Sequence, residues 1–184
     1  FIQIFEAKHF RKISKLRENK VVLEIGCGQG VGTKLIKKYF KPNKIYAIDL
    51  DPNMIKRANN KMHNENVLFE KGDAAKLNFP DKTFDAIFDF GIIHHIPNWK
   101  DCLKELNRVL KPGGKLCVTV WNMFSDYARE KFALDAQMEN PQKNFDARDF
   151  FIPWKATQGK DVTRYVHAFT KEELCDLARA AGFK

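Results

Sequence analysis

Three glycines and a carboxylate stand together near the start of the chain, in a pattern suited to holding a nucleotide. Glu24 is followed by Gly26, Gly28 and Gly30, at every second position. Glycine lets the backbone turn tightly and approach a ligand closely, because no Cβ intervenes. Dinucleotide-binding loops follow the pattern G-x-G-x-x-G, and Val31 stands where the third glycine would be. The spacing therefore favours a nucleotide cofactor other than a dinucleotide.

Two aspartates follow at the ends of later apolar runs. Asp49 comes about 20 residues after the glycine loop, a separation that suits acceptance of hydrogen bonds from ribose hydroxyls. Asp73 and Ala74 follow the third such run, and Phe90 ends the fourth. Each aspartate by itself would more often be a strand-end or turn residue. Their order along one chain favours a single binding site.

Strands that alternate with helices must position these residues. The apolar runs 21–25, 44–49, 67–70, 84–90 and 115–120 are the expected strands. Thr170 and Glu173 have the spacing of a capping box that opens the last helix. The alternation predicts a parallel sheet covered on both faces. The buried helix faces are expected to be Val31, Leu35, Ile36 and Tyr39; Met54, Ile55, Ala58 and Met62; Trp99, Cys102, Leu103, Leu106, Val109 and Leu110; and Leu174, Leu177, Ala178 and Ala181.

The motif E-x-G-x-G-x-G and the order of acidic residues resemble the class I S-adenosylmethionine (SAM)-dependent methyltransferases. The resemblance implies a doubly wound, mainly parallel Rossmann-like α/β sheet in three layers. The family's last two strands would follow the last helix and are absent, so we expect a truncated chain. The single expected domain, 1–184, comprises a SAM-binding core at 20–120 and a substrate-recognition segment without clear periodicity at 121–169. The implied SAM contacts are Glu24, Gly26, Gly28, Gly30, Asp49, Asp73, Ala74 and Phe90, with Asp73 at the adenine amino group.

The composition of the chain agrees with a globular enzyme. It has 184 residues, 44% of them hydrophobic and 30% charged, and no apolar run long enough to span a bilayer. Its four cysteines show no C-x-x-C spacing, which favours reduced thiols in a cytoplasmic protein and no metal site. The net charge of +9 suits a polyanionic substrate such as RNA. Lysine-rich composition and an anionic membrane surface remain alternative explanations of that charge.

Four short groups suggest the substrate. They are Ile92-Ile93-His94-His95, Val120-Trp121, Ile152-Pro153-Trp154 and Arg164-Tyr165-Val166-His167-Ala168-Phe169. Together they resemble the tRNA wobble-uridine carboxymethyl methyltransferases, which esterify a carboxymethyl group on the anticodon base. The resemblance covers residues 20–183. It departs from the family at Val166, where a tyrosine is usual, and in residues 1–20, which contain neither proline nor tryptophan.

This chemistry needs alignment more than a general base, because a carboxylate is ionised at neutral pH. Arg164 would grip the carboxylate, and His94 or His95 would hydrogen-bond the acceptor. The rings of Trp121, Trp154 and Tyr165 would stack on the uridine, and His167 would also contact it. For each of these side chains, a purely structural role is the alternative. An amine or phenol acceptor would instead require a base, which Asp89 or a histidine could supply.

Two other functions remain open at this point. One is a methyltransferase of the quinone or sterol type, which would share the SAM-binding half. The other is a non-catalytic subunit of the same fold that binds RNA or a partner protein. The expected partners are the tRNA anticodon loop and, from the resemblance, a small zinc-binding activator along the strand edge Val67–Glu70; no membrane association is expected.

Overall fold

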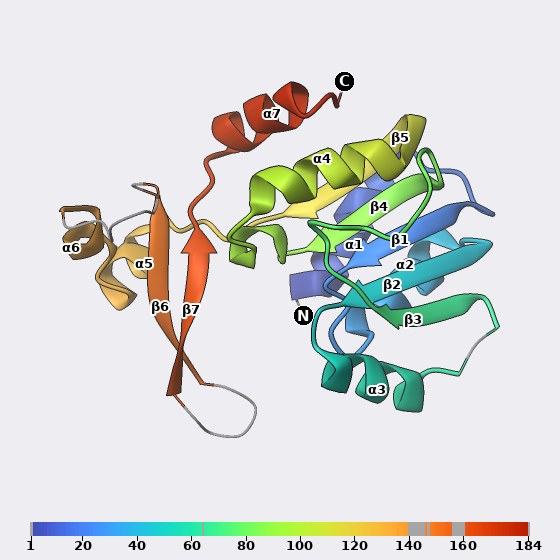
Figure 1. Ribbon diagram of the computed structural model, residues 1–184, viewed down its shortest axis with the longest axis horizontal. Helices are drawn as coiled ribbons and strands as arrows, with labels where there is room; N and C mark the ends of the chain where they lie inside the picture. Colours follow the sequence, from blue (N-terminus) through green and yellow to red (C-terminus); the bar gives the residue numbers. More distant parts are fainter. Residues whose placement is uncertain (1, 64, 140–145, 147, 156–160, 184) are drawn as a thin grey trace.

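Five parallel strands form the central sheet. The computed structural model describes residues 2–63, 65–139, 146, 148–155 and 161–183. The strand order is β3-β2-β1-β4-β5, and every neighbouring pair is parallel (Figure 1). This confirms the predicted α/β fold. The strands are β1 (Val21–Ile25), β2 (Lys44–Asp49), β3 (Val67–Lys71), β4 (Phe84–Phe90) and β5 (Leu110–Thr119).

Helices cover both faces of this sheet because successive strand residues point to opposite sides. Val22 lies in one core with Phe10, Ile36 and Ala58, which come from α1, α2 and α3. Leu23 lies in the other core, against α4 and α7. The bounds of these helices are α1 (Ile2–Ser14), α2 (Val31–Phe40), α3 (Pro52–Lys61), α4 (Trp99–Val109) and α7 (Lys171–Ala180).

The segment expected to lack periodicity contains a small subdomain. An antiparallel hairpin of β6 (Asp149–Lys155) and β7 (Asp161–His167) packs with two short helices, α5 (Asp126–Lys131) and α6 (Leu134–Glu139). Figure 1 shows this hairpin beside the edge at which the parallel strands end. Phe150 and Ile152 alternate into its core, but aromatic and proline residues at the intervening positions obscure that period in the sequence.

The predicted buried face of α2 differs from the observed one. Val31 is 56% exposed, and the buried residues of α2 are Gly32, Thr33, Ile36 and Phe40. The helix is rotated relative to the prediction because its first turn packs on Glu24 rather than on the apolar core. The last helix has the predicted capping box, and Leu174, Leu177 and Ala181 of its predicted face pack against the core, although none of its residues is fully buried.

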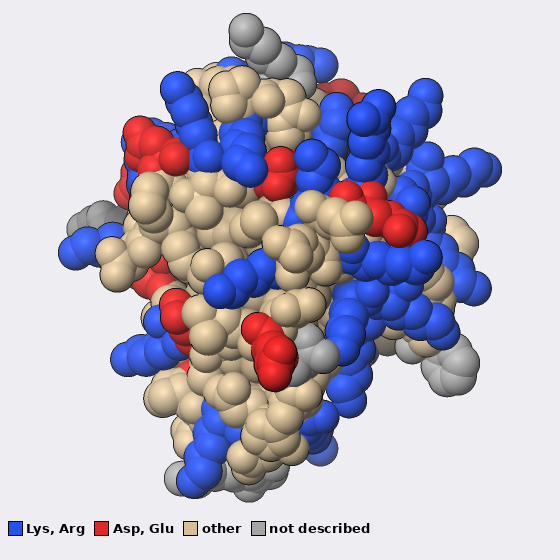
Figure 2. All heavy atoms as spheres, turned by 90° about the vertical axis from the view of Figure 1, so that its right-hand side faces the viewer, with Lys and Arg blue, Asp and Glu red and all other residues tan. Residues whose placement is uncertain are grey.

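Basic side chains are distributed unevenly over the surface. Figure 2 views the edge at which the parallel strands begin, and shows lysine and arginine gathered along one side. That side lies at the back of Figure 1, where α1 and α2 pack together. No helix among the described residues is long and apolar enough to cross a membrane.

Candidate functional site

The glycine loop after β1 is held in a sharp bend by an aspartate from the neighbouring strand. The Gly28 amide donates to Asp49 Oδ2 over 2.8 Å, and the Asp51 amide donates to Asp49 Oδ1 over 2.9 Å. Gly26 and Gly28 have φ values of 63° and 52°, a region that side chains rarely adopt. A Cβ on Gly26 would collide with Ile92, whereas one on Gly28 would meet no atom within 4 Å. The loop therefore leaves an open cradle at Gly28.

Glu24 lies beneath this loop rather than facing the cradle. Its side chain is 2% exposed and accepts a hydrogen bond from the Thr33 hydroxyl. Burial raises the pKa of Glu24 to about 8, and the negative charges of Asp49 and Asp89 add to this shift. Gly32 makes room for the carboxyl, since a Cβ there would overlap Glu24 Oε1. Thr33 and Gly32 thus belong to the site, and their position in an apparently amphipathic helix concealed that role in the sequence.

The other predicted cofactor residues lie at the same edge of the sheet. Asp73 is exposed, and its Oδ1 accepts a hydrogen bond from the Ala75 amide over 2.9 Å. Ala74 is buried beside it. Phe90, at the end of β4, is half-buried, and its ring lies 5.8 Å from that of Phe10.

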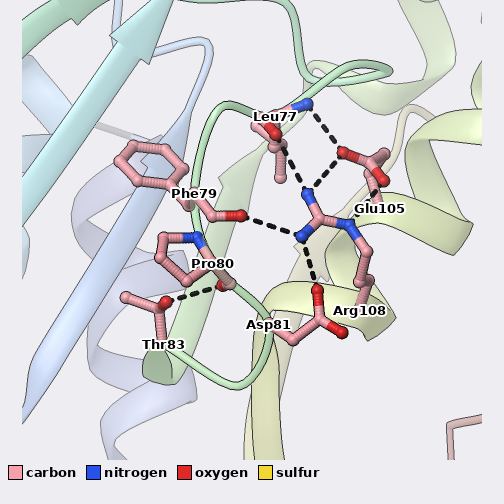
Figure 3. A network of polar contacts seen from close by, with 7 residues as sticks. All are labelled: Leu77, Phe79, Pro80, Asp81, Thr83, Glu105 and Arg108. Atoms are coloured by element: carbon pink, nitrogen blue, oxygen red, sulfur yellow. Dashed lines mark hydrogen bonds and ion pairs between the residues drawn. The ribbon is translucent and has the colours of Figure 1, made fainter.

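A single arginine fastens the loop that carries Asp73 to helix α4. Arg108 donates to the carbonyl oxygens of Leu77 and Phe79 over 3.0 and 2.8 Å, and it forms ion pairs with Glu105 and Asp81 (Figure 3). Glu105 in turn accepts from the Leu77 amide. This network, which the sequence did not reveal, replaces regular secondary structure between Asp73 and β4.

Five predicted substrate residues from separate segments meet at the carboxyl end of the sheet. His94 and His95 lie on the turn η1 (Ile93–His95), and their ring centroids are 4.1 Å apart. Trp121 contacts both rings at 5.1 and 5.0 Å. The Trp154 ring lies 5.9 Å from Trp121, and the Arg164 guanidinium lies 4.1 Å from the Trp154 centroid. We call these five residues the aromatic cluster.

The two histidines are held neutral. His95 Nδ1 donates to the Tyr165 carbonyl oxygen over 3.0 Å, so its Nε2 is left to accept from Arg164 Nη1 at 3.4 Å. Burial, together with the nearby charge of Arg164, lowers the pKa of His95 to about 4 and that of His94 to about 3. Neither ring nitrogen of buried His94 has a hydrogen-bond partner among the described residues.

Arg164 is a half-buried cation without a matching carboxylate. No ion pair to it forms within the described part of the chain, and burial lowers its pKa. The guanidinium is instead held by the ring of Trp154 and by neutral His95. Such an arrangement leaves donors available for a planar anion.

Tyr165 and His167 lie apart from this cluster in a buried network. The Tyr165 hydroxyl and His167 Nδ1 both donate to Asp149 Oδ1, each over 2.6 Å. The Tyr165 ring packs on Phe151, and His167 packs on Trp99. Both residues are at least nine-tenths buried, so the expected stacking role of Tyr165 and substrate contact of His167 are replaced by structural roles. Asp149 was missed because its partners on β7 become adjacent only in the hairpin.

Asp89 is likewise committed to the backbone. It is fully buried and accepts from the amides of Ile92 and Ile93 over 2.6 and 3.0 Å, which anchors the turn that carries the histidines. Burial raises its pKa to about 7.

Comparison with known proteins identifies the family of the chain. Residues 23–118 match the family described as a methyltransferase domain. The chain belongs to the class I SAM-dependent methyltransferases. SAM is therefore its cofactor, and the open space at Gly28 fits the close approach of that cofactor to the backbone.

The relatives of this methyltransferase act on diverse acceptors. A fatty-acid O-methyltransferase of Mycolicibacterium smegmatis is 37% identical over 102 residues, which are 55% of this chain and 37% of that protein. The sterol 24-C-methyltransferase erg6 of Aspergillus fumigatus is 34% identical over 116 residues, 61% of this chain and 30% of its own length. The chain thus spans about a third of the length of each of these two relatives.

Two solved structures share the fold over nearly the whole chain. The PH0226 protein from Pyrococcus horikoshii is 29% identical with a TM-score of 0.67, covering 97% of this chain and 79% of its own. A chain from the complex of the Haloferax volcanii Trm112 methyltransferase activator with a methyltransferase is 18% identical with a TM-score of 0.68. That match covers 96% of this chain and 66% of the other.

Proposed function

We propose that this methyltransferase esterifies the carboxyl group of a modified wobble uridine in tRNA. The observation that carries the proposal is Arg164, a half-buried cation that lacks a carboxylate partner among the described residues and lies beside neutral His95. An acceptor carboxylate would complete a bidentate pair with its guanidinium. The exposed ring of Trp154 and the half-buried ring of Trp121 offer flat surfaces for a uracil base.

The reaction needs no proton transfer from the protein. Bound SAM supplies an electrophilic methyl group. A carboxylate oxygen forms the new O–CH3 bond as the S–CH3 bond breaks in line, and the electron pair of that bond stays on the departing sulfur. Arg164 holds the second carboxylate oxygen, and neutral His95 accepts from Arg164 Nη1 and so fixes the direction of the guanidinium. Alignment of the reacting atoms is the main contribution of the site.

In this proposal, SAM lies along the glycine loop. Gly26, Gly28 and Gly30 expose backbone to its amino-acid end, and Glu24 supports them from below. Asp49 accepts from the ribose hydroxyls with the lone pairs that its two backbone donors leave free. Asp73 and Ala74 lie at the adenine, and Phe90 closes the floor of the pocket.

The names of the relatives favour a second candidate, a lipid or sterol acceptor. The aromatic cluster is apolar enough to contact such a molecule. Arg164 beside a sterol would remain without a counter-charge, whereas a fatty-acid carboxylate would pair with it as the uridine carboxylate would. The net charge of +9 suits a polyanion better than a single carboxylate, and this observation favours tRNA over a fatty acid.

A direct test compares acceptors. The protein is incubated with radiolabelled SAM and either tRNA that carries 5-carboxymethyluridine or the same tRNA with unmodified uridine. We expect label only in the modified tRNA, as an ester that mild alkali releases. Labelled fatty acid or sterol with unlabelled tRNA would replace this proposal with the second candidate.

We further propose that a small zinc-binding activator adds a strand to β3. This strand is at one end of the sheet order, and Leu68 on it is 39% exposed. The fold similarity to a chain solved with the Trm112 activator supports the proposal. Leu68→Glu should abolish co-purification with such an activator, whereas Val162→Glu, at the equally exposed tip of the hairpin, should not.

A further inference from the structure

The edge at which the strands begin, opposite the candidate site, carries a pocket. It has a volume of about 260 Å³ and lies between the turn after α1 and the turn within β5. Asp85 is the one acidic side chain among its described lining residues. The basic residues that line it, which we call the basic pocket, are Lys15, Arg17, Lys20, Lys111 and Lys115.

The charges of the basic pocket are not balanced within the protein. Asp85 forms ion pairs with Lys20 at 3.5 Å and Lys111 at 3.2 Å. Lys15, Arg17 and Lys115 are exposed and form no ion pair with any described residue. Like charges held around a hollow repel one another, and an anion that enters the hollow relieves that repulsion.

A track of further cations joins this pocket to the candidate site. Helix α2 runs from the glycine loop back to the edge at which the strands begin. Lys34, Lys37 and Lys38 on it are exposed and form no ion pair with any described residue. Lys8 and Lys12 are exposed on the adjacent α1. Figure 2 shows the resulting concentration of basic side chains. Strands rise about 3.3 Å per residue, so the track crosses roughly 20 Å between the two edges.

We propose that the basic pocket and this track bind the phosphate backbone of the RNA whose modified nucleotide occupies the aromatic cluster. A single phosphate fits the hollow, whereas a flat anionic bilayer cannot enter it. A bilayer also cannot follow a track that passes around a side of the molecule from one edge to the other. Phosphate contacts of this kind fix the position of an RNA without reading its sequence. The choice of RNA rests on the proposed function.

The test neutralises the pocket and a matched surface. The pocket variant carries Lys15→Gln, Arg17→Gln and Lys115→Gln. The control variant carries Lys100→Gln, Lys104→Gln and Lys171→Gln on α4 and α7, the helices that cover the other face of the sheet, and it changes the net charge equally. Binding of a fluorescent anticodon stem-loop without the wobble modification is measured by anisotropy at several salt concentrations. Thermal unfolding and SAM binding are measured on both variants to exclude misfolding.

We expect the pocket variant to bind the stem-loop about tenfold or more weakly, with a salt dependence whose slope falls by about one unit for each phosphate that the variant no longer binds. The control variant should keep most of the affinity. Equally weakened binding in the two variants, or unchanged binding in the pocket variant, would overturn the inference. The inference would also be overturned if the wild-type protein bound phosphatidylserine vesicles and the stem-loop did not displace it from them. Because binding is measured without methyl transfer, a tRNA that binds through the pocket but is not methylated would refute only the proposed reaction.

Discussion

Gly28→Ala should separate cofactor binding from folding. The backbone at Gly28 has a φ of 52°, and an alanine Cβ there would meet no protein atom within 4 Å. The cost to the folded protein is thus confined to the left-handed backbone, about 1–2 kcal/mol. For a chain of this size, that corresponds to a fall in melting temperature of about 2–8 °C.

Gly28→Ala should also weaken cofactor binding, by a cost separate from the backbone strain in the folded protein. The new methyl group would project into the space that the cofactor must enter, and overpacking of this kind costs about 1–3 kcal/mol. We therefore expect the dissociation constant of SAM to rise by about 5- to 150-fold. Isothermal titration calorimetry would measure it, with kcat near saturation as a second readout.

Gly113→Ala is the matched control for this experiment. Gly113 has a φ of 75° and an equally open Cβ position, but it lies on the turn within β5, away from the cradle. It should lower the melting temperature similarly and leave SAM affinity unchanged. If Gly28→Ala binds SAM as tightly as Gly113→Ala does, the cradle is not where we place it.

Three further predictions follow from the same geometry. Arg164→Lys should lower kcat/KM for the carboxylate acceptor by about hundredfold without changing SAM affinity, because an ammonium cannot make the planar bidentate pair; equal rates for the variant and the wild type would contradict this role. Arg108→Gln should lower stability by about 1–2 kcal/mol and weaken SAM binding, since the loop that carries Asp73 is then no longer fastened to α4, whereas Lys104→Gln on the same helix should do neither. Folding raises the pKa of the Glu24 carboxyl from an ordinary value of 4.5 to about 8, so the folded protein binds a proton there that the unfolded chain releases. Stability should therefore fall as pH rises from about 4.5 to 8. Urea unfolding of Glu24→Gln should show a flatter profile over that range, and a profile as steep as that of the wild type would refute the argument.

The cofactor half of the molecule was largely predictable because its signals are local. Strand, glycine loop and helix are consecutive, so the position of Asp49 could be inferred from the lengths of adjacent elements. The confirmed strand bounds, Lys44–Asp49 and Phe84–Phe90, reflect continuous apolar runs that leave little choice of conformation. The capping box at Thr170 is equally local, since both of its hydrogen bonds close within one turn.

The substrate half was harder to predict because its order arises from contacts distant in sequence. Phe150 and Ile152 gain their alternation only against β7, and a proline such as Pro153 is uncommon within a strand. The hairpin tolerates that proline because it has only two strands, each with a free edge within the described structure.

By itself, the sequence determined the parallel sheet, the glycine-rich loop and the residue types that meet in the aromatic cluster. Only the tertiary structure decided their roles. It placed Arg164 against Trp154 and His95 with no carboxylate partner among the described residues, and it placed Tyr165 and His167 against Asp149, although all three stand within four positions on one strand. The physical reason is the pleat of β7, which points neighbouring side chains to opposite faces, together with its close packing on η1. Burial and the identity of the facing side chain, rather than residue type, determine whether a polar group is free to bind a ligand.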